Sequence, residues 1–293
     1  MAPPFLRRMP RVRRAVRAGR VRGQQAALHW RALSAGRRML PHFIVIGAQK
    51  AGTSSLFEYL CAHPDVLPPF RKEVHFFDNA FERGERWYRA FFPRASAAAR
   101  RDGRPAAVTG EASPYYLFEP RVPERAHALV PGARLIALLR DPVERAFSQY
   151  EHSRRKGLET RTFEEAIEEE LRELPGEVER MLADPGYRSP LHQHRAYLAR
   201  GCYAEQLERW SRWYPRERIL LVRSEDLFAD PARAFGRVLE YLGLRPFTPP
   251  GFAAHNSHPY RSRLRPETRA FLERYYAPHN ARLREWSGNA IAW

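Results

Sequence analysis

The sequence predicts an α/β fold with three layers, in which a central, mostly parallel sheet is covered by helices on both faces. Three short apolar runs, 43–46, 134–139 and 218–222, read as strands, and each precedes a segment with helical spacing. Strands this apolar are typical of parallel sheets buried on both sides. The 293 residues are enough for one such domain with a sizeable core.

Positive charge is concentrated at the N-terminus. The formal net charge is +17, and residues 1–40 hold eleven arginines and no acidic residue. This segment lacks the apolar core of a secretory signal, so we expect a disordered, solvated tail capable of weak contact with an anionic membrane. The folded domain is predicted over 41–293. That part carries little net charge, which does not favour a specific nucleic-acid-binding face.

The two cysteines, Cys61 and Cys202, lie far apart in the chain without metal-ligand spacing. We therefore expect free thiols in a reducing, cytoplasmic compartment and no metal site. No run approaches the ~18 apolar residues that a membrane-spanning helix requires.

The stretch 43–55 (FIVIGAQKAGTSS) predicts an anion-binding loop between a strand and a helix. Gly47 ends the strand, and Gly52 precedes a helix that begins at Thr53. Backbone N–H groups converge at such a helix start, where the helix dipole favours negative charge. Ordinary phosphate loops place a lysine directly after the second glycine, whereas here Lys50 precedes it. This displacement argues against a Mg-dependent nucleoside triphosphatase. A tight turn without a ligand is the alternative.

The run 72–78 (KEVHFFD) packs a cation, two acids and an imidazole among aromatic residues. It is either a strand edge with a charged, solvated side or a catalytic segment. A carboxylate beside a histidine in an apolar setting can have a perturbed pKa that suits general-base catalysis. The four aromatic residues of the predicted helix 83–92 are interpreted as core.

A strand near 108–112 leads into a proline turn, and the strand 134–139 ends at Arg140. Pro142 suits the first turn of the helix predicted up to residue 156, and Ser148 lies two turns into it. Arg140 either pairs with a neighbouring acidic residue or binds an anion at the end of the sheet.

The other predicted elements rest on caps and prolines. They are a helix after a Thr162–Glu165 capping box, a loop at 175–190 with three prolines, and helices at 120–131, 197–213, 231–242 and 266–286.

Taken together, these motifs resemble the sulfotransferases that use 3′-phosphoadenosine 5′-phosphosulfate (PAPS), and KEVHFFD resembles the heparan sulfate sulfotransferases and their bacterial relatives. The resemblance covers roughly 41–293. It implies a P-loop-like fold, PAPS as donor and no metal. The residues that it implies for the 5′-phosphosulfate are Lys50, Ala51, Gly52, Thr53 and Ser54.

The resemblance also implies roles in the transfer itself. Glu73 would take the proton of the acceptor hydroxyl, with Lys50 and His75 as further catalytic residues. Arg140 and Ser148 would hold the 3′-phosphate. The residues implied near the acceptor are Lys72, Asp78 and Ser113.

Two segments depart from the family pattern. Ala112 stands where the family often has a lysine that contacts acidic glycans, which weakens the expectation of a heparan-like substrate. The late segment 257–263 (SHPYRSR) lacks the family's Lys-Gly-Arg cluster. Whether His258, Arg261 or Arg263 completes the 3′-phosphate site stays open.

The function predicted from these residues is sulfuryl transfer from PAPS to an acceptor hydroxyl, with a saccharide or glycolipid as the acceptor. The alternatives are a nucleotide-dependent kinase with a phosphate loop and a polyanion-binding protein that acts through its basic tail. A kinase would need a lysine after the second glycine and an acidic residue at a strand end for Mg²⁺. Polyanion binding that depends strongly on salt and is lost when residues 1–40 are removed would support the second alternative.

Overall fold

The computed structural model describes residues 23–99, 106–253 and 262–293. Four parallel strands form one sheet in the order β2-β1-β3-β4, which confirms the predicted parallel sheet. The strands are β1 Phe43–Gly47, β2 Gly110–Ala112, β3 Arg134–Leu139 and β4 Ile219–Arg223.

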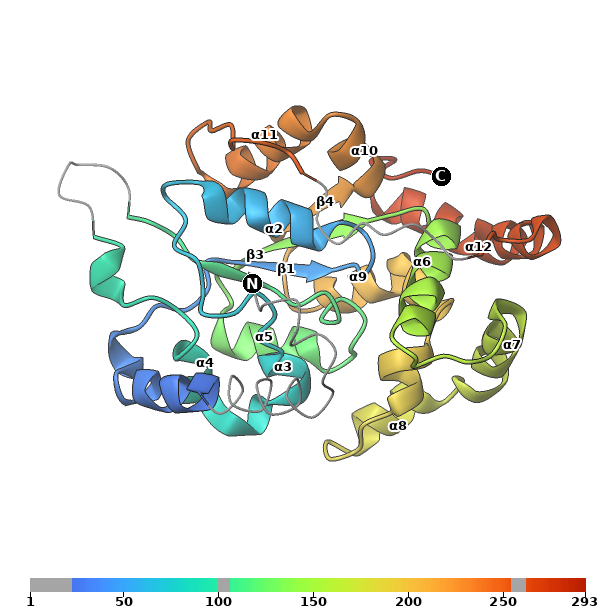
Figure 1. Cartoon of the computed structure of the whole chain (residues 1–293), viewed down its shortest axis with the longest axis horizontal. Helices are drawn as coiled ribbons and strands as arrows, with labels where there is room; N and C mark the ends of the chain where they lie inside the picture. The colour runs from blue at the N-terminus through green and yellow to red at the C-terminus, as the bar shows by residue number, and fades with distance from the viewer. Residues whose placement is uncertain (1–22, 100–105, 254–261) are drawn as a thin grey trace, which may run out of the picture.

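Helices cover both faces of this sheet. Figure 1 shows α2 and α11 on one side of the strands and α3, α4 and α5 on the other. All five residues of β1 are buried, as expected for a central strand covered on both faces. These helices are α2 Thr53–Ala62, α3 Phe76–Asn79, α4 Gly84–Arg89, α5 Val122–Leu129 and α11 Pro231–Leu242.

A second group of helices lies toward the end of the sheet to which the β1 arrow points (Figure 1). It comprises α6 Pro142–Arg155, α7 Phe163–Glu173, α8 Glu177–Ala183, α9 Tyr203–Ser211 and α12 Pro266–Trp286, and α10 Ser224–Ala229 follows β4. Short 3-10 turns occupy Ala35–Arg37, Phe81–Arg83, Ala95–Ala97, Ala199–Gly201 and Arg216–Arg218, and a π turn occupies Leu191–Arg195.

Two predicted boundaries need correction. The stretch predicted as loop, 175–190, contains α8, because Pro175 and Pro185 flank this helix instead of interrupting it. The helix predicted from residue 197 begins only at Tyr203. By contrast, the capping box is confirmed, since Thr162 Oγ1 accepts from the N–H of Glu165 and the Glu165 side chain accepts from the N–H of Thr162.

The strand order determines where a ligand can bind. From β1 the chain continues to β2 on one side of it, and β3 then pairs with β1 on the other side. The carboxyl ends of β1 and β3 therefore lie side by side at the point where the topology reverses direction. Open parallel sheets bind ligands in the crevice at such a point.

The N-terminal boundary of the domain lies earlier than predicted. Residues 23–33 form a helix that buries Leu28 against the core. Arg31 Nε donates to the Ala90 carbonyl at 2.6 Å, and Arg38 Nη1 donates to the Phe92 carbonyl at 2.9 Å. The expectation of a disordered tail up to residue 40 is thus corrected for 23–40, because arginines counted as solvated charge instead satisfy buried carbonyls.

The rest of that tail, residues 1–22, lies outside the described residues, and so does the membrane contact expected of it. Within the described ranges, no helix is long and apolar enough to cross a bilayer. Cys61 and Cys202 are free, and burial raises the pKa of each thiol to about 12. The cytoplasmic location stays a prediction.

Truncation tests the corrected boundary. Removal of residues 1–34 deletes Leu28 and Arg31 and should lower the melting temperature by about 5–10 °C, since burial of one leucine contributes roughly 1.5–3 kcal/mol. Removal of residues 1–22 serves as the control and should leave the melting temperature unchanged. Equal melting of the two truncated proteins would show that 23–34 contributes nothing to the fold.

Candidate active site

Two glycines determine the shape of the loop after β1. A Cβ on Gly47 would lie 2.5 Å from Leu117 Cβ, so a side chain does not fit there. Gly52 has φ +93° and serves as N-cap of α2. The amides of the first turn of α2 lack intrahelical acceptors by helix geometry and favour an anion. The N–H of Ala51 donates to the Ala48 carbonyl at 3.2 Å and closes the loop.

Lys50 lies at the centre of this loop among other cations. Its φ of +75° is a left-handed conformation that lysine rarely adopts. Burial, followed by the charges of Arg155, Arg140 and Lys156, lowers the pKa of Lys50 to about 8. Side chains of like charge that converge in a half-buried place form a site that an anionic ligand would stabilise.

Arg140 lies against the loop, as predicted from its place at the end of β3. Its Nη1 donates to the Lys50 carbonyl at 3.3 Å. Its Nη2 also lies 3.7 Å from the Glu144 carboxylate, so the alternative ion pair is present as well. Ser148, on α6, is largely buried with 6% of its surface exposed. The structure thus brings the two predicted donor-binding motifs together.

Lys72 joins this loop to the predicted base. Its Nζ lies 3.0 Å from Ser54 Oγ, in the first turn of α2, and 3.0 Å from Glu73 Oε1. The Glu73 side chain is 42% exposed and therefore open to an acceptor. Residues 72–75 form neither strand nor helix, which corrects the strand-edge alternative.

His75 binds both neighbouring carboxylates. Its Nδ1 donates to Asp78 Oδ2 at 2.7 Å, and its Nε2 donates to Glu73 Oε2 at 3.3 Å. Burial alone would lower the pKa of His75, but these two hydrogen bonds outweigh it and raise the pKa to about 10. Burial alone would raise the pKa of Glu73, yet His75 and Lys72 lower it to about 2. Glu73 is therefore an ionised carboxylate between two cations.

Two residues predicted near the acceptor have no access to one. Ser113 is fully buried, donates to Glu111 Oε2 at 2.7 Å and accepts from the His75 N–H at 3.2 Å. Asp78 is 1% exposed and binds His75. We therefore correct both assignments, since these side chains orient His75 from beneath and cannot touch an acceptor.

Comparison with known proteins identifies the family. The family model described as "Sulfotransferase domain" matches residues 40–251. Human heparan sulfate glucosamine 3-O-sulfotransferase 6 is 32% identical over 282 residues, which cover 88% of this chain and 75% of the relative. This chain belongs to the sulfotransferase family. The predicted enzyme class, which takes its sulfuryl group from PAPS, is confirmed at the level of the family.

Another relative and one solved structure differ in how much of their length this sulfotransferase matches. Human bifunctional heparan sulfate N-deacetylase/N-sulfotransferase 3 is 34% identical over 214 residues, which cover 71% of this chain but 23% of that protein. The crystal structure of a sulfotransferase from Alicyclobacillus acidocaldarius superposes with a TM-score of 0.65 at 29% identity, covering 86% of this chain and 98% of the other. The shared fold is thus a sulfotransferase fold.

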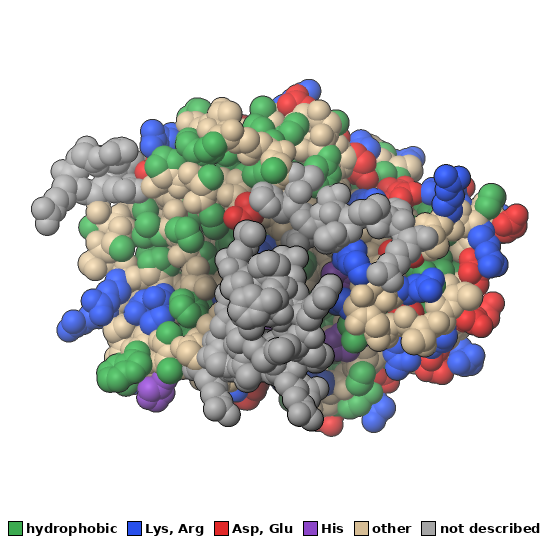
Figure 2. Space-filling model, in the orientation of Figure 1, with side chains coloured by type: hydrophobic (Ala, Val, Ile, Leu, Met, Phe, Trp, Pro, Cys, Tyr) green, Lys and Arg blue, Asp and Glu red, His purple; other side chains and the backbone are tan. Residues whose placement is uncertain are grey.

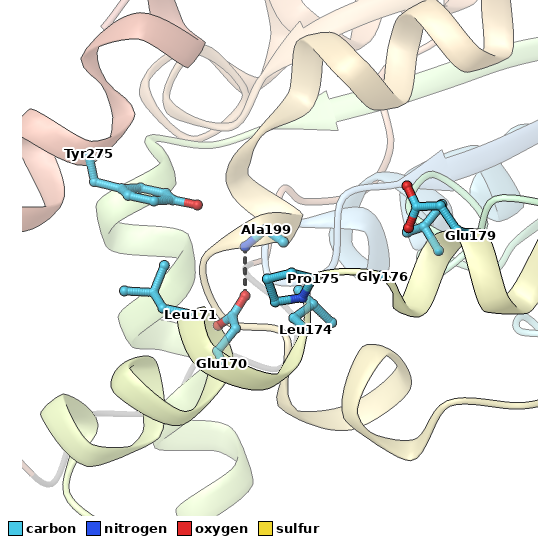
Figure 3. Close-up of a pocket in the computed structure, with 9 residues that line it drawn as sticks. Glu170, Leu171, Leu174, Pro175, Gly176, Glu179, Ala199 and Tyr275 are labelled. Atoms are coloured by element: carbon cyan, nitrogen blue, oxygen red, sulfur yellow. Dashed lines mark hydrogen bonds between the residues drawn. The ribbon is translucent and has the colours of Figure 1, made fainter.

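A cavity of about 270 Å³ lies between α7, α8, the 3-10 turn at Ala199–Gly201 and α12, and none of its lining residues belongs to this loop. Figure 3 shows Glu170, Leu171, Leu174 and Tyr275 around it. Glu170 already accepts hydrogen bonds from three backbone N–H groups, so its carboxylate anchors the segment 197–199. We therefore place the active site at the loop and not in this cavity.

Sequence reasoning missed two buried residues that support the site. Glu111 accepts from Tyr88 at 2.5 Å and from the Val74 N–H at 3.3 Å, and burial raises its pKa to about 7. The signal available in the sequence was an acidic residue inside a predicted strand. Arg200 had no comparable signal, because arginine is abundant throughout this chain.

Most of the segment 257–263, which was expected near the 3′-phosphate, lies outside the described residues. Arg263 is exposed, whereas His258 and Arg261 lie outside the described residues. Within the described ranges, no group of three or more His, Cys, Asp or Glu side chains could hold a metal ion.

The pKa of His75 is directly testable. Replacement of Asp78 by Asn removes one anionic acceptor and should lower the pKa of His75 from about 10 toward its ordinary 6.5, as followed by NMR titration of the imidazole. Since the folded pKa exceeds the ordinary value, His75 ionisation stabilises the wild-type fold below pH 6.5, and this contribution is lost as the pH rises toward 10. Replacement of the exposed Glu82 by Gln is the control. Identical titration of His75 in the wild type and Asp78→Asn would refute the pairing.

Proposed function

We propose that this sulfotransferase transfers a sulfuryl group from PAPS to a carbohydrate hydroxyl, with Glu73 as general base. One observation carries the proposal: Lys72 Nζ lies 3.0 Å from Ser54 at the donor loop and 3.0 Å from Glu73. A single lysine side chain thus bridges Glu73 and the start of α2. Glu73 is therefore close enough to deprotonate an acceptor that attacks a sulfuryl group held at that helix start.

The donor-binding roles follow from charge and position. The first-turn amides of α2, with the hydroxyls of Thr53 and Ser54, would hold the 5′-phosphosulfate. Arg140 would bind the 3′-phosphate through its guanidinium fork, with the Ser148 hydroxyl beside it. Lys50 would neutralise the charge that develops on the oxygen between phosphorus and sulfur. The positive cluster around Lys50 supports this proposal.

The reaction that these groups support is an in-line displacement at sulfur. The acceptor oxygen forms a bond to sulfur as the bond from sulfur to the phosphate oxygen breaks, and Glu73 takes the hydroxyl proton. Positioning and electrostatic stabilisation supply most of the acceleration, and the base adds about 10²–10⁴-fold.

The low pKa of Glu73 makes it a weak base while it binds both cations. Lys72 already reaches the donor side through Ser54, so a bound phosphosulfate offers it a stronger anionic partner than Glu73. Loss of the Lys72 contact would raise the pKa of Glu73 toward its ordinary value. Donor binding would thereby prepare the base for the acceptor.

The nature of the acceptor rests on the relatives. The one matched over 75% of its length is named as a 3-O-sulfotransferase of heparan sulfate glucosamine, and the one matched over 23% is named as an N-sulfotransferase. The first relative also matches more of this chain, 88% against 71%, which favours a sugar hydroxyl over an amine. Ala112, at the position where the family pattern often has a lysine that contacts acidic glycans, is fully buried in β2. The absence of that lysine weakens a heparan-like acceptor, and an oligosaccharide or a glycolipid is our proposal.

The two alternatives have less support. A kinase with a phosphate loop would need a lysine directly after Gly52, and this sequence has Thr53 there. The polyanion-binding alternative depends on the basic tail, of which residues 1–22 lie outside the described residues. The described surface offers it no continuous basic patch on the α7 and α12 side of the face drawn in Figure 2, where Lys and Arg side chains are interspersed with acidic ones. Neither alternative explains why a carboxylate and an imidazole lie beside the loop.

Replacement of Glu73 by Gln tests the base. We expect transfer of labelled sulfate from PAPS to desulfated heparan and neutral oligosaccharides to fall at least ~100-fold, because the amide cannot accept the proton. Binding of 3′,5′-adenosine bisphosphate, measured by calorimetry, should persist. Glu85→Gln, on the exposed side of α4, is the matched control and should retain full transfer. Activity of Glu73→Gln within a few-fold of this control would eliminate Glu73 as the base.

A further inference from the structure

Arg200 is a buried cation whose described hydrogen bonds all go to neutral oxygens. It is 4% exposed, and it donates to the side-chain oxygen of Gln49, to the His192 carbonyl at 3.0 Å and to the Gln193 carbonyl at 2.5 Å. Its guanidinium also stacks over the Tyr115 ring at 4.8 Å. A buried charge without a carboxylate partner carries a large desolvation cost, so a purely structural role would be served better by an apolar residue.

The backbone around Arg200 is held in place. Glu170 accepts from the N–H groups of Tyr197, Leu198 and Ala199 at 2.5, 2.7 and 2.8 Å, and Figure 3 shows the bond to Ala199. A Cβ on the next residue, Gly201, would lie 2.8 Å from the Tyr276 ring, so the turn is packed tightly against α12. Arg200 therefore projects from a fixed support.

One end of Arg200 restrains the donor loop. Gln49, which it binds, directly precedes Lys50 with its unfavourable φ of +75°. Arg140 binds the Lys50 carbonyl on the other side. A strained backbone conformation persists only where its surroundings hold it, and here two arginines hold consecutive residues of the loop.

The other end of Arg200 leads to the acceptor side. Gln193 Nε2 donates to Asn79 Oδ1 at 3.2 Å, and Asn79 Nδ2 donates to Asp78 Oδ2 at 3.1 Å. Asp78 in turn accepts from His75. With the Lys72 contacts, these bonds close a circuit that leaves the donor loop at Gln49 and returns to it at Ser54. Its members are Gln49, Arg200, Gln193, Asn79, Asp78, His75, Glu73, Lys72 and Ser54.

We propose that Arg200 is a positioning residue that holds the donor loop in its binding conformation and couples donor binding to the segment 189–195, which supports the His75–Asp78 pair. The proposal rests on the proposed function, because it assigns the donor loop to a nucleotide. Arg200 itself touches neither reacting group. It acts through Gln49 on one side and Gln193 on the other.

The test uses 3′,5′-adenosine bisphosphate and the full chain. In Arg200→Met we expect its affinity by calorimetry to fall about tenfold, as for loss of a hydrogen bond from a charged group. In the wild type the ligand should slow amide hydrogen exchange both in the loop and in 189–195. In Arg200→Met and in Gln49→Ala the slowing in 189–195 should be lost, while Arg200→Lys should restore part of it.

Arg121 provides the matched control. It is also a buried arginine, and it donates to the carbonyls of Pro185 and Tyr187 on the same stretch of chain, but it pairs with Glu119 and has no described bond to the loop. Arg121→Met should leave the affinity within about twofold of the wild type, since Arg121 has no described contact with the loop and substitutions at sites that share no partner usually act independently. It should also retain the slowed exchange in 189–195.

The possible outcomes separate the two proposals. If the wild type binds the nucleotide and Arg200→Met behaves like Arg121→Met, the positioning role is refuted and the proposed function stands. If the wild type does not bind the nucleotide, the proposed function fails and the positioning role fails with it. If Arg200→Met does not fold, Gln49→Ala decides, and unchanged slowing in 189–195 in that variant refutes the coupling.

Discussion

Positive charge converges at the carboxyl ends of β1 and β3, and the arrangement of the site depends on this constraint. Lys50 has its pKa lowered to about 8 by burial and by neighbouring cations, while Arg140 binds the backbone of the same residue. The parallel pairing of β1 with β3 forces these groups together. Repulsion between these like charges destabilises the ligand-free protein, and a ligand with two phosphate groups would relieve that repulsion.

On the proposed acceptor side, carboxylates take the place that cations have at the loop. Glu73 lies between the cations of Lys72 and His75, and the buried carboxylates of Asp78 and Glu111 support that group from below. Because Lys72 also reaches Ser54, the carboxylate and the donor loop share the same ammonium group. Donor binding and base activation are therefore linked through one side chain in the proposed mechanism. The Arg200 route would link the same two regions through the protein interior.

Sequence reasoning succeeded where one local rule decides the structure. The strand 134–139, the helix 266–286 and the capping box of Thr162 follow from apolar runs, prolines and a cap, and the structure has each of them. It failed where tertiary contacts decide. Arg31 and Arg38 looked like part of a solvated tail, but carbonyls distant in the sequence accept their hydrogen bonds. Ser113 and Asp78 were placed at the acceptor because a motif gives proximity and not the direction in which a side chain points.

The central claim is that one nucleotide binds both the loop after β1 and Arg140. Calorimetry that compares 3′,5′-adenosine bisphosphate with adenosine 5′-diphosphate, which lacks the 3′-phosphate, tests it most directly. The 3′-phosphorylated nucleotide should bind at least ~10-fold more tightly, as expected for one charge-assisted bidentate contact, and Arg140→Ala should abolish that difference. Equal affinity of the wild type for the two nucleotides, or a preference that survives in Arg140→Ala, would contradict the account.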